Sequence, residues 1–418
     1  MGSDNTKRSI SFSPPDISEA EINEVAECLR SGWITTGPRT KELERRIAEY
    51  VGTSKCVCLA SATASEELNL RILGIGEGDE VIVPAYTYSA SAAAAIHVGA
   101  TVVFIDSQPD SCEMDYDAME AAITEKTKAV IPVDLGGVVC DYDRIFEAVE
   151  RKRNLFTPSG NTDLGMRIQK SLGRVAVVAD CAHALGSDRH GVKAGNIADF
   201  SSFSFHAVKN FTTGEGGASV WRDLDGVDND EIYKWFQLYS LHGQNKDALT
   251  KSQLGSWEYD IIAPLYKCNM TDIMASIGLR QLDRYTDLLN RRGEIVDEYD
   301  FMCDNLGLDH INHFGLDYNS CCHLYLVRVP GISDEKRREI IVKMAEKGIS
   351  CNVHYKPLPM MTAYKSCAQI KGGGADIKDF PNSYHLYENE ITLPLHTRLS
   401  NEDVAYIIDS FTEIIKGL

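Results

Sequence analysis

Short, continuously apolar runs alternate with helical patterns through the first two-thirds of this 418-residue chain. A half-buried strand alternates apolar with polar residues, whereas these runs do not, so each is typical of a strand buried on both faces. Such strands occur in mostly parallel sheets that helices cover on both sides. The sequence therefore predicts an α/β fold. The runs lie at 55–61, 80–84, 101–106, 129–133 and 175–180, and two further strands are expected at 200–205 and 218–221.

The pattern changes near Thr271, where a long amphipathic helix is expected. That helix and the later strand and helices are expected at 272–299, 323–329, near 334–347 and from 401 onward. A chain of this length exceeds what one compact core usually accommodates. We predict a large α/β domain over 11–275 and a smaller C-terminal α+β domain over 276–418. The polar stretch 151–173 contains no strand pattern and is predicted to be an insertion or a long loop.

Composition and charge exclude several classes of protein. The net charge of −19 is spread along the chain, which opposes binding to nucleic acid. The 12 cysteines include no C-x-x-C pair, so no metal site is expected. No signal peptide and no apolar run of transmembrane length is apparent, so we predict a cytoplasmic protein with reduced thiols and no membrane partner. Two glycine clusters, at 74–79 and 214–217, lead into strands and match neither a dinucleotide-binding motif nor a P-loop.

Ligands of an open parallel sheet bind beyond the carboxyl ends of its strands, so the residues after each run are candidates for a site. Ala62 and Thr63 follow the first run and open a helix, whose free N–H groups suit a phosphate. The alternative is that Thr63 or Ser61 is only a helix cap. Tyr86 and Tyr88 follow the second run, where a ring can stack on a flat ligand or be an ordinary buried aromatic.

Charged side chains end two of the later runs. Asp180 ends one of them and is followed by His183. A carboxylate at the end of a buried strand requires a cationic or hydrogen-bonding partner, which is either structural or functional. Ser204 and Lys209 follow another run. A sheltered lysine has a lowered pKa and becomes a nucleophile able to form a Schiff base, whereas an exposed one is only a solvated charge.

Together these features form the four parts of a pyridoxal 5'-phosphate (PLP) site: a phosphate seat, a stacking aromatic ring, a strand-end acid and a strand-end lysine. The acid keeps the pyridine nitrogen protonated so that the ring can accept electrons. The lysine binds the cofactor and moves the proton between substrate and cofactor carbons. The sequence therefore predicts an enzyme that carries PLP covalently on Lys209.

Six segments resemble one known family in order and spacing. They are SGWITTGPRTKELE (31–44), ASATASEE (60–67), PAYTYSAS (84–91), ADCAHALG (179–186), SFHAVKNFTTGEGG (204–217) and LYKCNMTDIMASIGLRQL (265–282). The resemblance runs from about Ser31 to Pro394 and is to the DegT/DnrJ/EryC1/StrS family of PLP-dependent sugar aminotransferases. It implies the fold of the type I aminotransferases.

The resemblance also implies a role for single residues. Lys209 would be the Schiff-base lysine and Asp180 the partner of the pyridine nitrogen. Asn269, and less closely Lys267, would complete the site of the other subunit of a homodimer. The remaining implied contacts are those of His183 and Tyr88 with the ring, of Ala62, Thr63 and Ser204 with the phosphate, and of Trp33, Thr35, His323 and His354 with the nucleotide-sugar pocket.

The activity that the resemblance implies is a two-stage transamination. Glutamate would convert PLP to its amine form, PMP, and a nucleotide-linked keto-sugar, in our reading a UDP-4-keto sugar, would accept the amine in amino-sugar or surface-glycan synthesis. One alternative is a sugar dehydratase of the same family, in which a histidine replaces the lysine. Another is a non-catalytic regulatory protein. Asp134 and Pro359 stand where the family often has histidine, which leaves the substrate open.

Overall fold

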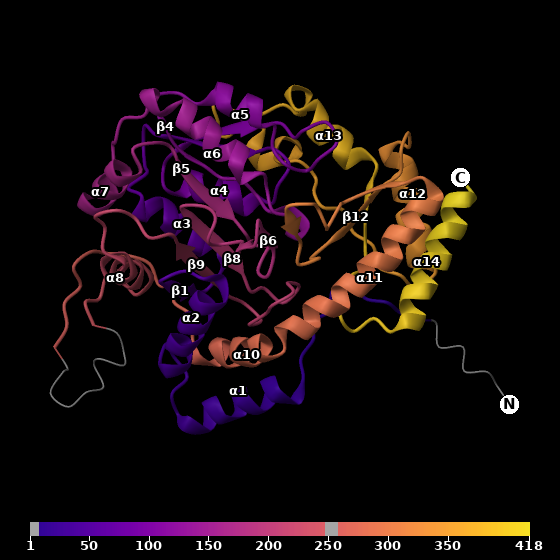
Figure 1. Ribbon diagram of the computed structural model, residues 1–418, viewed down its shortest axis with the longest axis horizontal. Coiled ribbons are helices and arrows are strands. Elements are labelled where there is room, and N and C mark those ends of the chain that lie inside the picture. The colour runs from indigo at the N-terminus through magenta and orange to yellow at the C-terminus, as the bar shows by residue number, and fades with distance from the viewer. Residues whose placement is uncertain (1–7, 247–257) are drawn as a thin grey trace.

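The centre of the molecule is a seven-stranded sheet in the order β1-β9-β8-β5-β4-β2-β3 (Figure 1). The computed structural model describes residues 8–246 and 258–418. All strands of this sheet run in the same direction except β9, which is antiparallel to both of its neighbours. The strands are β1 (Cys56–Leu59), β2 (Glu80–Pro84), β3 (Thr101–Ile105), β4 (Thr127–Val130), β5 (Ala176–Asp180), β8 (Phe200–Ser204) and β9 (Gly217–Trp221). The predicted α/β class with a mostly parallel sheet is confirmed.

Helices cover both faces of this sheet. One face packs against α2 (Pro38–Val51), α5 (Tyr116–Ala122), α6 (Tyr142–Arg151) and α10 (Asp272–Asp283). The other face packs against α3 (Ala62–Ile72), α4 (Ser89–His97), α7 (Asp163–Leu172) and α8 (Asn229–Ser240). Alternate residues of one strand supply the two cores, as Ile82 does on the first face and Val81 and Val83 do on the second. This two-sided burial is the reason that the strands contain continuous apolar runs.

The C-terminal part of the chain builds a smaller antiparallel sheet in the order β10-β12-β13. Its elements are β10 (Asp309–His310), β12 (Tyr325–Arg328), β13 (Glu390–Leu393), α11 (Tyr285–Leu306), α12 (Asp334–Glu346), α13 (Pro381–Glu388) and α14 (Asn401–Lys416). The long helix α11 connects the two parts (Figure 1). Its residues up to Leu288 pack in the core of the large sheet, whereas those from Ile295 onward pack in a separate core with α12 and α14. The division of the chain at residue 275 stays a prediction.

Two further groups of elements lie outside these layers. The short strands β6 (Asp188–Arg189), β7 (Val192–Lys193) and β11 (Tyr318–Asn319) form a third sheet. Helix α1 (Glu19–Ser31) packs along α10 at one edge of the molecule (Figure 1). No helix in the described ranges combines the length with the apolar composition that a membrane crossing requires.

The expected single helix over 272–299 is two helices, α10 and α11, which meet at Arg284. The chain contains neither proline nor glycine at this point. Instead, the Arg284 guanidinium is bound away from the helix axis, where it donates to Glu21 Oε1 at 2.8 Å and to Asp16 Oδ1 at 2.9 Å. These tertiary contacts explain why helical periodicity did not reveal the break.

Of the two alternatives for 151–173, an insertion or a long loop, the long loop is wrong for the second half, which is helix α7. Thr162 caps the helix, because its Oγ1 accepts from the Gly165 N–H at 2.9 Å. Leu164, Ile168 and Leu172 are spaced four residues apart and are buried in the core beneath the sheet. The polar composition reflects the outer face of an amphipathic helix.

If α7 is an integral part of the core, Ile168→Ala lowers the free energy of unfolding by about 2–5 kcal/mol, because it leaves a cavity under the sheet. Lys170, which is exposed on the same helix, is the matched control, and Lys170→Ala changes stability by less than about 0.5 kcal/mol. Urea denaturation followed by circular dichroism measures both variants. Equal stabilities would show that α7 packs only loosely.

Candidate active site

A cavity of about 350 Å³ opens where β5 and β8 end, at the carboxyl edge of the parallel sheet. This is the place at which open α/β sheets bind ligands. The predicted site residues that line it are Ala62, Thr63, Tyr88, Asp180, His183, Ser204, Lys209, His323 and His354. The four other predicted residues, Trp33, Thr35, Lys267 and Asn269, do not line it. The structure thus brings most of the predicted site together from six separate stretches of chain.

One end of the cavity is the N-terminus of α3. Ser61 is the N-cap, and its Oγ accepts from the Ala64 N–H at 3.1 Å. The N–H groups of Ala62 and Thr63 belong to the first turn, where a helix offers no carbonyl acceptor. The backbone of Gly217 packs against this turn, since a Cβ there would lie 2.3 Å from the Ser61 carbonyl carbon. Both sequence interpretations hold in part: Ser61 caps the helix, and the two following N–H groups remain available to an anion.

Asp180 lies at the floor of the cavity and is 5% exposed. Its Oδ2 accepts from Ser91 Oγ at 2.7 Å and its Oδ1 from the Ala182 N–H at 3.1 Å. No ion-pair partner of Asp180 exists in the described part of the chain. Burial raises the pKa of this carboxyl, although the two hydrogen bonds and the Lys209 charge oppose that effect. A buried acid without a cationic partner fits a ligand that brings its own N–H cation.

Lys209 faces the same cavity, which accounts for its remaining exposure. Its ammonium has no hydrogen bond or ion pair to any of the residues that the structure describes. Burial lowers the pKa of Lys209 to about 8, and the negative charge of Asp180 partly opposes that shift. Roughly a tenth of the amine is therefore neutral at pH 7, and the neutral form is the one that a nucleophile requires. Amine, acid and anion seat fit the three ends of a pyridoxal phosphate molecule.

Two histidines form one wall, and their partners fix their protonation. The Gly136 N–H donates to His183 Nδ1 at 3.1 Å, so this nitrogen carries no proton and the Nε2–H points to the Tyr355 hydroxyl at 3.1 Å. Burial, with the charge of Lys209, holds the pKa of His183 well below its usual value. The rings of His183 and His323 lie 4.4 Å apart, and His323 Nδ1 lies 2.9 Å from the amide oxygen of Asn210. Both imidazoles are neutral because burial disfavours the charged form.

The two candidate tyrosines have different positions. Tyr88 lies at the mouth of the cavity and is 62% exposed, so its ring is available to cover a flat ligand. Tyr86 is buried behind the wall, where its hydroxyl donates to the His354 carbonyl at 2.8 Å, and the possibility that it stacks on a ligand is wrong. Sequence reasoning missed Tyr355 and Ser91, which touch His183 and Asp180. In the sequence, only their positions pointed to them: Tyr355 directly follows His354, and Ser91 lies three residues after Tyr88.

Trp33, Thr35, Lys267 and Asn269 form a separate group on the outer surface. The Asn269 amide donates to Thr36 Oγ1, and Trp33 Nε1 donates to the Thr36 carbonyl at 3.2 Å. Thr35 and Lys267 are exposed. Exposed apolar side chains from α1, the following turn and the chain before Lys267 lie in the same parts of the sequence, namely Ile22, Leu29, Ile34, Ile261, Ile262 and Tyr266.

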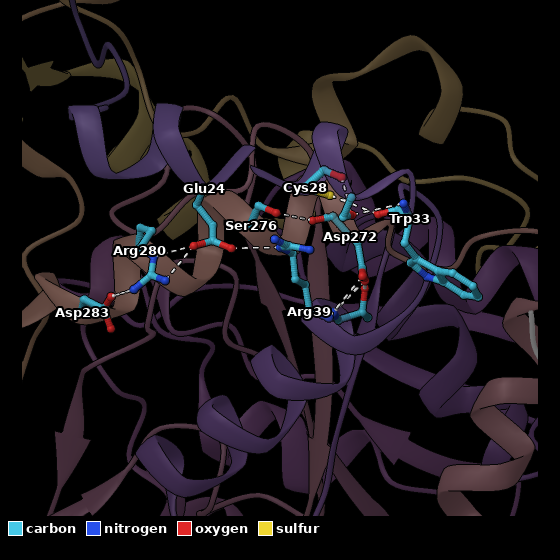
Figure 2. A network of polar contacts seen from close by, with 10 residues as sticks. Glu24, Cys28, Trp33, Arg39, Asp272, Ser276, Arg280 and Asp283 are labelled. Atoms are coloured by element: carbon cyan, nitrogen blue, oxygen red, sulfur yellow. Dashed lines mark hydrogen bonds and ion pairs between the residues drawn. The ribbon is translucent and has the colours of Figure 1, made fainter. Parts of the chain in front are cut away.

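Asp272 fixes the turn that follows Trp33 and Thr35 (Figure 2). Its buried carboxylate accepts hydrogen bonds from the Gly37 N–H at 2.8 Å, the Arg39 N–H at 3.1 Å and the Thr40 N–H at 2.9 Å, and from Thr40 Oγ1 at 2.7 Å. It therefore caps α2 while it opens α10. Gly37 allows the tight turn, because a Cβ there would clash with the Trp33 ring at 1.8 Å.

A second polar contact joins the same helices. Glu24 of α1 accepts from Arg39 Nε at 2.9 Å and from Arg280 Nη2 at 2.6 Å, as Figure 2 shows. The two arginines lower the pKa of Glu24, although its partial burial opposes them. Helices α1, α2 and α10 are thus tied together next to the turn that carries Trp33.

Comparison with known proteins gives three consistent similarities. The sequence pattern of the DegT/DnrJ/EryC1/StrS aminotransferase family matches residues 15–156 and 167–412, which leaves only ten residues before and within α7 unmatched in between. The spore coat polysaccharide biosynthesis protein SpsC of Bacillus subtilis is 35% identical over 97% of both chains. A UDP-4-amino-4-deoxy-L-arabinose–oxoglutarate aminotransferase of Shewanella sediminis is 33% identical over 96% of this chain and 97% of its own.

One solved structure is much more similar. Spr1654 of Streptococcus pneumoniae, assigned as a sugar aminotransferase, is 57% identical in its PMP form, with a TM-score of 0.92 over 98% of this chain and all of its own. The same protein has also been solved in a PLP form and in an apo form. The similarity therefore extends over both parts of the fold and over the whole cavity.

Removal of the Asp272 carboxylate leaves buried N–H groups without acceptors, so Asp272→Ala is expected to lower the free energy of unfolding by about 1–3 kcal/mol. Asp283→Ala is the matched control, because Asp283 forms only surface ion pairs with Arg46 and Arg280 and contributes less than about 1 kcal/mol. Chemical denaturation compares the two. Equal stabilities would contradict the role assigned to Asp272.

Proposed function

This chain belongs to the DegT/DnrJ/EryC1/StrS aminotransferase family, a PLP-dependent family, and we propose that it transfers the amino group of glutamate to a nucleotide-linked keto-sugar. The observation that carries the proposal is a single cavity that the Lys209 amine and the Asp180 carboxyl both line, beside the N-terminus of α3. PLP, when bound, supplies a ring that withdraws electrons from the carbon whose proton is removed. The cofactor alternates between its PLP and PMP forms during turnover.

Each residue of the cavity then has a definite task. The N–H groups of Ala62 and Thr63, with Ser204, bind the cofactor phosphate, and Tyr88 covers the ring face. Asp180 accepts the N–H of the pyridine ring, which also neutralises a carboxylate that is costly to bury. Lys209 holds the cofactor covalently and afterwards carries the proton on Nζ, for which a pKa near neutrality is suited. His183 lies beside the ring, and its Nε2–H already has Tyr355 as a partner.

The substrate assignment is supported by the relatives. The protein from Shewanella sediminis is named for a UDP-linked 4-amino sugar and for oxoglutarate, the keto acid that glutamate leaves behind. SpsC is named for polysaccharide biosynthesis. We therefore favour a UDP-4-keto sugar as acceptor, glutamate as donor and a role in surface-glycan synthesis. His323 and His354 on the cavity wall are the residues that would contact the sugar. We place the enzyme in the cytoplasm, because all 12 cysteines are free thiols.

A homodimer with shared sites is the second part of the proposal. Asp272 binds the Gly37 N–H and so fixes the turn after Trp33 and Thr35, and Asn269 donates to Thr36 in the same turn. These residues and Lys267 lie outside their own subunit's cavity. Exposed apolar side chains lie in the same stretches of chain, as expected of a surface that another subunit covers. We propose that this group completes the cavity of the partner subunit.

The substrate proposal predicts that the protein, supplied with PLP, glutamate and a UDP-4-keto sugar, forms the corresponding UDP-amino sugar, which mass spectrometry detects. In this assay Lys209→Ala abolishes turnover and the visible absorption band of the bound cofactor, because no amine remains to hold it. Asp180→Asn keeps the fold but lowers turnover by about 10²–10³-fold.

Matched incubations with dTDP- and GDP-linked keto-sugars serve as controls for the nucleotide. Product from one of these and none from the UDP-sugar would reject the UDP assignment. Loss of a sugar hydroxyl without gain of nitrogen would instead indicate a dehydratase. Full activity of Lys209→Ala would reject the assignment of the site.

Shared sites predict complementation between two defective variants. Lys209→Ala and Asn269→Ala subunits are each poorly active alone, but a random mixture contains mixed dimers with one intact site, so about a quarter of wild-type activity returns. The control is a mixture of Lys209→Ala with Asp180→Asn. Lys209 and Asp180 both belong to the part of the site that a subunit supplies to its own cavity. Every cavity of a mixed dimer is therefore defective, and no activity should return. Equal behaviour of the two mixtures would refute the shared site.

A further inference from the structure

The wall of the cavity around His354 is backed by strand β13 of the smaller sheet. Asn352 and Thr392 exchange both backbone hydrogen bonds, at 3.0 and 2.8 Å, so the segment that leads to His354 runs antiparallel to β13. This register places His354 opposite Glu390. Glu390 and Thr392 are two residues apart on the strand, and their side chains therefore lie on the same face.

Three hydrogen bonds link His354, Glu390 and Thr392. The backbone N–H of His354 donates to Glu390 Oε2 at 2.8 Å. Thr392 Oγ1 lies 2.5 Å from Glu390 Oε1 and 2.9 Å from His354 Nδ1. Glu390 and Thr392 are 1% and 0% exposed, so water does not compete for these contacts. The His354 ring stacks on Phe12, with centroids 5.5 Å apart, and lines the cavity.

The Thr392 hydroxyl has one proton and can donate to only one of its two neighbours. When Glu390 is neutral, its proton lies on Oε1, because Oε2 already accepts from the His354 N–H. Thr392 then accepts from Glu390 and donates to Nδ1, which leaves the imidazole proton on Nε2. When Glu390 is ionised, Thr392 donates to Oε1 and accepts from Nδ1–H, and Nε2 becomes an acceptor. The protonation state of Glu390 thus determines whether His354 presents a hydrogen-bond donor or an acceptor at Nε2.

We propose that Glu390, Thr392 and His354 form a proton relay that delivers a proton at Nε2 of His354 to an oxygen atom of the bound sugar substrate. The proton on Glu390 Oε1 moves to Thr392 Oγ1, the hydroxyl proton moves to Nδ1, and the Nε2 proton passes to the acceptor oxygen. Glu390 is left as a carboxylate and His354 stays neutral. The identity of the acceptor rests on the proposed function, whereas the relay itself does not. Glu390 and Thr392 are positioning residues, since only His354 reaches the cavity.

The charges around the relay favour this behaviour. Burial raises the pKa of Glu390 to about 8, against the hydrogen bonds from Thr392 and His354 and the charge of Arg337. Burial, together with the charge of Lys209, lowers the pKa of His354 to about 3, so the ring changes tautomer and not charge. The other groups that face Glu390 are Tyr86, Cys112, Arg328, Cys351 and Tyr355, and those that face His354 are Lys209, His183 and His323.

The sign of the pH dependence follows directly. Below about pH 8 Glu390 is neutral, and His354 donates through Nε2; above that pH Glu390 is ionised, and Nε2 accepts. Lys209 would titrate in the same range when its amine is free, so the measurement uses the PLP-loaded protein and a Glu390 variant that leaves Lys209 unchanged.

The test is a pH titration of ¹⁵N-histidine-labelled, PLP-loaded protein by long-range proton–nitrogen correlation NMR, from about pH 6.5 to about pH 9.5. The His354 signals are identified by their loss in His354→Gln. In the wild type we expect the proton to move from Nε2 to Nδ1 with a midpoint near the pKa of Glu390. Thr392→Ser keeps a hydroxyl and should retain this change.

Two nearly isosteric variants should abolish this pH-dependent movement of the His354 imidazole proton. Thr392→Val has no hydroxyl and disconnects the imidazole from Glu390. In Glu390→Gln the amide oxygen accepts from the His354 N–H, so the amide NH₂ donates to Thr392 and holds the imidazole proton on Nε2 at every pH. Denaturation midpoints confirm that each variant is folded.

Two results would overturn the relay: a wild-type tautomer that stays constant over the whole range, or a change that persists in Thr392→Val or Glu390→Gln. The measurement reads the tautomer and not turnover. A chain that does not aminate sugars would still show the inversion, and an active aminotransferase without it would leave the proposed function standing.

Discussion

The pairing of a buried carboxyl with a sheltered amine in one cavity organises the elements around them. Asp180 and Lys209 are both disfavoured as ions by burial, and in the described residues neither has a charged side chain close enough to form an ion pair. Such an arrangement is costly unless a ligand brings complementary groups to both. A pyridoxal ring does so, with its N–H at one end and its aldehyde at the other. The anion seat at α3 matches the remaining phosphate, so cofactor binding and protein stability favour the same geometry.

The parallel sheet is what makes this geometry possible. Because β5 and β8 are parallel neighbours, the ends that carry Asp180 and Ser204 open on the same edge, and β9 returns beside them so that Gly217 can pack against the turn at Ser61. On the other side the cavity is closed by His323, which precedes β12, and by His354, on the segment that pairs with β13. The large sheet supplies Asp180 at the floor of the cavity. The smaller sheet supplies Glu390 and Thr392, which determine whether His354 in the wall donates or accepts a hydrogen bond.

Prediction from the sequence succeeded where one short segment contains the whole signal. Six of the seven strands of the large sheet were located to within two residues, and β4 to within three, because two-sided burial requires continuous apolar runs. It failed where distant partners decide the outcome. The bend at Arg284 depends on Asp16 and Glu21, and the position of Tyr86 depends on the His354 carbonyl. Helix α7 was missed because a mostly polar segment with widely spaced apolar residues was taken for a loop.

The α/β class, the strands and the chemical identity of the acid and the amine could be predicted from residue order alone, since these depend on local patterns of burial and on residue type. The folded chain was needed to show that Asp180 and Lys209 face one cavity and that Trp33 and Asn269 lie outside it. It was also needed to show that Glu390 reaches His354 through Thr392. A pKa, a tautomer and a hydrogen-bonded path are properties of groups that the fold brings together from distant positions. No local pattern of residues encodes them.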